Sequence, residues 1–354
     1  MVTPVFGVPN WSFGVPPGGT MGVMKRMLVV AVLAAAWLAQ PTTAYAHVGR
    51  SPSVAVDDRA RITRIEPPNA PFDVRVVDGD QDLWLQLKPG NDLVVLGASG
   101  EPFLRFHRGA VFANTRSPTA QSDLFGVIPA RSTEAPPTPP SWWKVSSGAS
   151  YLWHDHRLHA LALLSGVGPP RKLGQWHIPL RLNGRRAVIV GGLWSVSGPQ
   201  RWFWLMIPLV ILAGALTILR FGGAPLIRMG GATLGAITAV AVVIARAGRD
   251  LYGRPEVTTG RYVSLGIALA LGVLALDRLV RARQDAAAFI GMIVGVIGLV
   301  EGLTLLPTFW NAVVLAAIPS WLERLCAALA LGAGTASLIY SFAGTTEDLN
   351  QPIP

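Results

Sequence analysis

The chain has 354 residues, of which 51% are hydrophobic and only 14% are charged, and its formal net charge is +10. Soluble domains usually carry about 25% charged residues, so this composition excludes a wholly soluble protein. The basic residues form no cluster with interleaved aromatic residues, which argues against nucleic-acid binding. Apolar residues gather at 27–39 and again after Trp202. This distribution predicts an exported domain followed by a membrane domain, with the lipid bilayer as a partner.

The start of the chain predicts a secretory signal peptide over residues 24–46. A lysine and an arginine precede the apolar run Met27–Leu38, and the small-x-small sequence Ala44-Tyr45-Ala46 follows it. This order is typical of a cleaved signal peptide, and an uncleaved anchor is less favoured because nothing prolongs the apolar run. Residues 1–23 fit no part of a signal peptide, and we interpret them as a non-native N-terminal extension of the gene model.

Residues 47–200 show the alternating pattern of short β-strands separated by turns. The predicted strands are Phe72–Val77, Leu83–Leu87, Leu93–Leu96, Phe103–Phe106, Ala110–Ala113, Trp143–Val145, Ser150–Trp153, Gly174–Arg181 and Arg186–Trp194. Asn183-Gly184 predicts a hairpin between the last two. The proline-rich residues 129–141 cannot form a strand and are expected to be a loop or a linker within the domain. The pattern therefore predicts an all-β, sandwich-like exported domain.

Residues 201–342 predict a bundle of five transmembrane helices. The apolar segments, each close to the roughly 20 residues that a spanning helix needs, are Trp202–Leu219, Met229–Ala245, Tyr262–Leu279, Ala287–Leu306 and Leu322–Ser341. Residues Phe309–Ile318, bounded by prolines, are too short to span and are expected to form an interfacial or re-entrant half-helix. The signal peptide places the exported domain outside the plasma membrane. An odd number of spans then leaves the tail, residues 343–354, in the cytoplasm.

Two charged residues lie in or beside these apolar segments. Glu301 falls within the fourth segment, and Arg246 ends the second segment at a similar expected depth. Ionisable groups in a bilayer are usually paired or functional. A structural ion pair or a protonated carboxyl group is the favoured interpretation. A place in a transport pathway is the alternative.

A histidine-rich motif marks the exported half. Three of the six histidines, His154, His156 and His159, fall within six residues. In a strand, His154 and His156 would share one face, which would begin a metal site, and His159 would join only if the chain turned near Leu158. The alternative is a buried hydrogen-bond network that holds a corner of the sheet.

The available ligand types limit the choice of metal. All seven methionines and the one cysteine lie outside residues 47–200. A soft Cu(I) site is therefore excluded from this domain, whereas nitrogen and carboxylate ligands suit Cu(II) or Zn(II).

Cleavage after Ala46 would make His47 the mature N-terminus, with its amine and imidazole available to one metal ion. This arrangement resembles the histidine brace of CopC-like copper-binding proteins. That resemblance implies a second ligand pair, which Asp155 and His156 would supply. The candidate ligands are therefore His47, His154, Asp155, His156 and His159.

A broader resemblance rests on four motifs: Gly100–Phe106, Asn114–Pro118, Trp153–Arg157 and Gly191–Trp194. They resemble an uncharacterised family of actinobacterial multi-pass membrane proteins with a signal peptide and an exported domain. The resemblance implies this layout and no activity. The motifs of hydrolases, metalloproteases and nucleotide-binding enzymes are absent. We therefore expect a non-enzymatic binding or assembly role in the cell envelope, with an envelope protein as a partner. A transporter or channel component is the alternative.

Overall fold

The computed structural model describes residues 54–126, 139–160, 170–252 and 284–348, together with scattered positions between 262 and 277. The predicted signal peptide, His47, most of the proline-rich segment and part of the third apolar segment lie outside the described residues. The predictions for these segments stay predictions.

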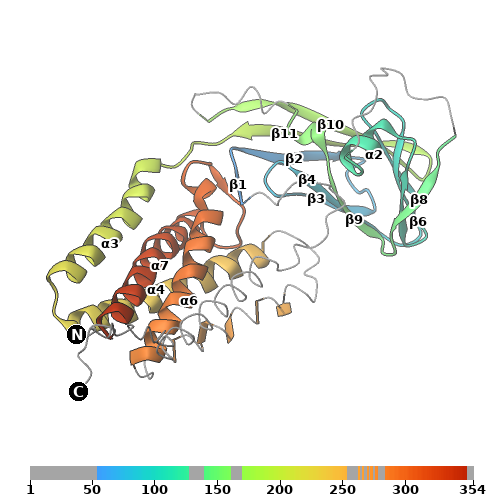
Figure 1. Cartoon of the computed structure of the whole chain (residues 1–354). Helices are drawn as coiled ribbons and strands as arrows, with labels where there is room; N and C mark the ends of the chain where they lie inside the picture. The colour runs from blue at the N-terminus through green and yellow to red at the C-terminus, as the bar shows by residue number, and fades with distance from the viewer. Residues whose placement is uncertain are drawn as a thin grey trace, which may run out of the picture. The chain divides into compact units, whose positions relative to one another are not determined.

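The β-rich region consists mainly of two antiparallel sheets (Figure 1). The larger sheet has the strand order β2-β11-β10-β5-β6-β7-β8, and the smaller has the order β3-β4-β9. The strand bounds are β2 Asp58–Glu66, β3 Phe72–Val77, β4 Asp82–Leu87, β5 Leu93–Leu96, β6 Pro102–His107, β7 Ala110–Asn114, β8 Trp142–Ser146, β9 Ser150–His154, β10 Lys172–Leu182 and β11 Arg185–Ser195.

One hydrophobic core receives side chains from both sheets. Leu83 and Trp153 come from the smaller sheet, and Phe106 and Ile178 come from the larger one. Each of these four side chains is at most 2% exposed. Burying a side chain of this kind contributes about 1.5–3 kcal/mol, so this shared core holds the two sheets together.

The structure confirms each of the nine predicted strands to within two residues at either end. The predicted hairpin is also present, because Asn183 and Gly184 adopt the positive φ angles of 50° and 78° that its turn requires. The short helix α2, Pro118–Asp123, was not predicted. It begins at the Ser117 cap, whose side chain accepts a hydrogen bond from Ala120 N.

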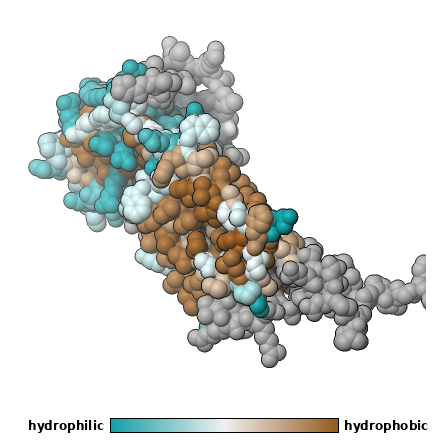
Figure 2. Space-filling view, turned by 90° about the vertical axis from the view of Figure 1, so that its left-hand side faces the viewer, coloured by the Kyte–Doolittle hydropathy of each residue, from teal (hydrophilic) through white to brown (hydrophobic). Residues whose placement is uncertain are grey.

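The helical region contains α3 (Arg201–Phe221), α4 (Ala224–Asp250), α6 (Gln284–Thr304) and α7 (Ser320–Asp348). Among the described residues, α3, α4 and α7 are long and apolar enough to cross a membrane. Large hydrophobic side chains remain exposed along α3, and the face on which α3 lies shows a broad hydrophobic surface (Figure 2). Helix α7 ends at Asp348, so the predicted tail begins inside a helix.

Helices α6 and α7 pack antiparallel through small residues. A Cβ atom added at Gly295 would lie 2.8 Å from Gly334 O, and one at Gly302 would lie 2.7 Å from Leu331 N. Only glycine permits backbones to approach this closely, as at other interfaces between membrane helices.

The predicted half-helix at 309–318 is wrong. A short 3₁₀ helix covers Leu306–Phe309, and the strand β12, Val313–Val314, pairs with β1, Ala55–Val56. The reason is Arg324 on α7, whose guanidinium donates hydrogen bonds to the carbonyl oxygens of Thr308, Asn311 and Ala312. These backbone groups are satisfied without a helix.

Candidate metal centre

The histidine motif lies where a strand changes into a turn. Strand β9 ends at His154, and the Asp155 carboxylate accepts a hydrogen bond of 3.1 Å from Arg157 N at the start of the 3₁₀ helix His156–Leu158. His154 and His156 therefore do not share one face of a strand, and that expectation was wrong. The turn occurs earlier than Leu158, and it brings His159 back beside the other two histidines.

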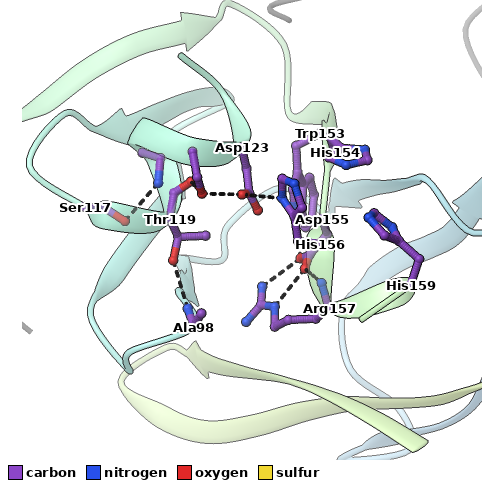
Figure 3. A network of polar contacts seen from close by, with 12 residues as sticks. Ala98, Ser117, Thr119, Asp123, Trp153, His154, Asp155, His156, Arg157 and His159 are labelled. Atoms are coloured by element: carbon purple, nitrogen blue, oxygen red, sulfur yellow. Dashed lines mark hydrogen bonds and ion pairs between the residues drawn. The ribbon is translucent and has the colours of Figure 1, made fainter. Parts of the chain in front are cut away.

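The three imidazoles form a compact cluster (Figure 3). One nitrogen from each of His154, His156 and His159 lies within 4.8 Å of the other two. The ring centroids of His154 and His156 are 4.7 Å apart, and those of His154 and His159 are 5.0 Å apart. His154 is buried, His159 is half-buried, and the side chain of His156 is 56% exposed. The cluster is therefore open to solvent on one side.

An oxygen atom faces the Nδ1 atom of every ring in the cluster. His154 Nδ1 lies 3.3 Å from Asp82 Oδ1, His156 Nδ1 lies 2.7 Å from Asp123 Oδ1, and His159 Nδ1 lies 3.2 Å from the Asp80 carbonyl oxygen.

Carbonyl and carboxylate oxygens accept hydrogen bonds, so these contacts favour a proton on each Nδ1. In that tautomer each Nε2 carries the lone pair that a metal ion would take. Metal-binding histidines are usually oriented by partners of this kind.

Burial also favours the neutral form of one ring. The pKa of His159 lies below its ordinary value because burial disfavours the charged ring, and the nearby imidazoles of His154 and His156 act in the same direction. Burial raises the pKa of the adjacent Asp80 carboxyl group. At neutral pH, His159 is therefore in the state that binds metal.

Asp155 is not a member of this cluster. Its fully buried carboxylate accepts hydrogen bonds of 2.8 and 2.7 Å from the Arg157 guanidinium and one of 3.1 Å from Trp153 Nε1. Burial alone would raise the pKa of Asp155, but the charge and hydrogen bonds of Arg157 hold it below its ordinary value. Arg157 also donates to the Leu96 carbonyl oxygen at 2.9 Å. The motif thus forms two adjacent features. Trp153, Asp155 and Arg157 make the hydrogen-bonded corner, and His154, His156 and His159 make the histidine cluster.

Sequence reasoning missed the three residues that orient the imidazoles. Asp80 lies in the turn between β3 and β4, Asp82 begins β4, and Asp123 ends α2, so each is distant in sequence from the histidines. The Ser117-Pro118 pair, a typical helix start, is the sequence signal that could have revealed α2.

Glu301 takes part in an ion pair, which was the favoured interpretation of this buried carboxylate. Glu301 forms an ion pair with Arg249, whose Nε also lies 3.9 Å from Glu323 Oε1. Arg246 pairs instead with Asp250, one turn away on α4, with Nε 3.2 Å from Oδ2. Arg246 and Glu301, which were expected at a similar depth, thus belong to different ion pairs, because the guanidinium three residues further along α4 reaches Glu301.

The sequence matches no family model, and no curated protein or solved structure is significantly similar to it. The resemblances to the actinobacterial membrane proteins and to CopC-like proteins therefore stay predictions.

Proposed function

We propose that this chain is a cell-envelope membrane protein whose exported domain, with two sheets arranged as a sandwich, binds one Cu(II) or Zn(II) ion through His154, His156 and His159. The observation that carries the proposal is the oxygen partner at every Nδ1. Three imidazoles that lie close together, each oriented by an oxygen partner, are a typical ligand set for either ion.

The dimensions of the cluster fit this role. Zinc–nitrogen bonds of about 2.0–2.1 Å place tetrahedral ligand nitrogens roughly 3.3 Å apart. The nitrogens here lie within 4.8 Å of one another, so a modest inward movement of the rings suffices. The exposed ring of His156 has room for such a movement. Three protein ligands leave a fourth position for water or for a ligand from a partner protein.

Calorimetric titration of the full-length protein in lipid nanodiscs, with zinc chloride or copper(II) chloride, tests the proposal. We expect one ion per chain with a Kd on the order of micromolar or tighter. His156→Ala should weaken binding at least about tenfold. His177→Ala is the matched control, because His177 is an exposed histidine on β10.

The proposal is wrong if neither ion binds, or if His156→Ala binds as tightly as the wild type. A second comparison concerns His47, which lies outside the described residues. Protein that begins at His47 should bind copper more tightly than protein with an N-terminal extension if the brace exists. Equal affinity would remove His47 from the ligand set and leave the triad.

We also propose five spans and a cytoplasmic C-terminus. The Arg249–Glu301 ion pair supports this topology, because it brings together the C-terminal ends of α4 and α6. The chain must therefore cross back between these two helices, and the predicted span at 262–279 is the apolar segment available for that crossing. A phosphatase fusion after residue 354 should be inactive and a fluorescent-protein fusion should be bright. The opposite result would contradict the odd number of spans.

A transporter or channel component is the second candidate function. It is favoured by two buried carboxylates, Glu301 and Glu323, that share the guanidinium of Arg249. Glu301→Gln keeps the shape of the side chain and removes its charge. If this change abolishes function in cells while folded protein levels are unchanged, the transport role is supported over the binding role.

A further inference from the structure

The turn between β3 and β4, together with Asp82 at the start of β4, orients two of the three clustered histidines. The Asp80 carbonyl oxygen faces His159 Nδ1 at 3.2 Å, and Asp82 Oδ1 faces His154 Nδ1 at 3.3 Å. The Gln81 carbonyl oxygen also accepts a hydrogen bond of 3.2 Å from Asp155 N. A movement of these two imidazoles toward a shared ion would therefore displace this turn as well.

The same turn lies beside Val56 of β1 and beside Leu315, a residue between α6 and α7. A Cβ atom added at Gly79 would lie 2.5 Å from Val56 Cγ2 and 3.5 Å from Leu315 Cδ2, so the backbone of the turn is in close contact with Val56 and Leu315 lies beside it. The Gly79 carbonyl oxygen accepts a hydrogen bond of 3.1 Å from Ala60 N. Gly79 has a φ of 77°, a conformation that glycine adopts without strain.

Leu315 belongs to the segment 305–319, which joins α6 to α7 and which we term the connecting loop. Leu315 N donates to the Val54 carbonyl oxygen at 3.0 Å, and Ala317 N donates to the Gly248 carbonyl oxygen near the end of α4 at 2.7 Å. Arg324 of α7 donates to the Thr308 carbonyl oxygen at 2.8 Å. The loop is thus bonded to the strand β1 on one side and to two membrane helices on the other.

We propose that occupancy of the histidine cluster by a divalent metal is transmitted through the β3–β4 turn and the connecting loop to α4 and α7. The protein then acts as a metal-responsive membrane transducer. This inference rests on the metal binding proposed above. Its physical basis is a continuous set of hydrogen bonds and packing contacts, in which each step joins elements that are distant in sequence. By linkage, whatever alters the loop must also alter metal affinity.

Hydrogen exchange of the full-length protein in nanodiscs, with and without saturating zinc chloride, tests the inference. We expect zinc to change the exchange of amides in the connecting loop, those of Leu315 and Ala317 included, by about fivefold or more. The response should vanish in His156→Ala. Exchange at the Asn183-Gly184 hairpin, which lies outside the proposed route, should stay unchanged.

The reciprocal test measures zinc affinity after a change in the loop. Leu315→Ala removes the side chain that lies beside Gly79 and should shift zinc affinity by about fivefold or more. Leu303→Ala is the matched control, because Leu303 on α6 is 50% exposed and should leave the affinity unchanged. If zinc binds with high affinity and loop exchange does not respond, the transducer inference is wrong and the metal site stands. If zinc does not bind at all, the proposed function is wrong and the inference falls with it.

Discussion

The imidazole Nδ1 of His156 lies 2.7 Å from a carboxylate oxygen of Asp123, a residue that is 3% exposed and belongs to a different element. Asp123 ends the helix α2, whereas His156 begins the turn after β9. A buried carboxylate thus orients the most exposed ring of the histidine cluster. The same pairing of a carboxylate with a metal-binding histidine recurs in zinc proteins.

Removing this orienting charge should weaken metal binding without removing a ligand. Asp123→Asn keeps the size of the side chain, and we expect zinc affinity to fall about tenfold, as measured by competition with a chromophoric chelator. Asp73→Asn, at an exposed position on β3, should have no effect. Unchanged affinity in Asp123→Asn would show that His156 needs no partner.

The acid sensitivity of the β-rich region should depend on Glu101. Its buried carboxylate accepts a hydrogen bond of 2.7 Å from the Ser117 hydroxyl and one of 3.1 Å from Ser99 N. Burial alone would raise the pKa of Glu101, but the bonds from Ser117 and Thr119 hold it below the ordinary value of 4.5. Because the folded-state pKa is lowered, its contribution to stability is present above pH 4.5 and is lost as the pH falls through the folded-state pKa.

Glu101→Gln should therefore lower the stability at pH 7 by roughly 1–3 kcal/mol and flatten the loss of stability in acid. Thermal unfolding followed by tryptophan fluorescence between pH 7 and pH 3 measures both effects. Glu66→Gln, at an exposed position, should change stability by less than about 0.5 kcal/mol. An acid slope in Glu101→Gln as steep as that of the wild type would contradict the pKa assignment.

The close contact at Gly298 should tolerate no larger side chain. A Cβ atom there would overlap Thr238 Cγ2 of α4 and would lie 3.0 Å from Ala330 O of α7. Gly298→Leu should destabilise the helices by at least about 1–3 kcal/mol, measured as a lower Tm in detergent. Gly214→Leu on α3 is the control, because no atom lies within 4 Å of the added Cβ. Equal Tm values for the two variants would refute this packing.

A double-mutant cycle should identify the true partner of Glu301. Arg249→Met alone leaves Glu301 and Glu323 buried without their shared cation, and we expect a loss of about 3–5 kcal/mol. Combining it with Glu301→Gln should recover part of that loss. Arg246→Met and Glu301→Gln should instead be additive within about 0.5 kcal/mol, because Arg246 pairs with Asp250. Strong coupling between Arg246 and Glu301 would overturn the observed pairing.

Local patterns in the sequence determined most of the secondary structure. Alternating side chains determine strands such as Phe72–Val77, because a strand with one buried face needs an apolar residue at every second position. The Asn183-Gly184 pair likewise determined its turn, since few other residues adopt two successive positive φ angles. The apolar helices follow from composition, because a bilayer accepts only long apolar segments.

Only the tertiary structure decided which side chains meet. The sequence by itself showed that three histidines are close along the chain. The structure shows that Asp155 pairs with Arg157 and that oxygen atoms of Asp80, Asp82 and Asp123, from other elements, contact the three rings. Glu301 likewise forms its ion pair with Arg249 and not with Arg246. Such contacts depend on strand pairing and helix rotation across long sequence separations, and a shift of one residue reverses a strand's faces or turns a helix by about 100°.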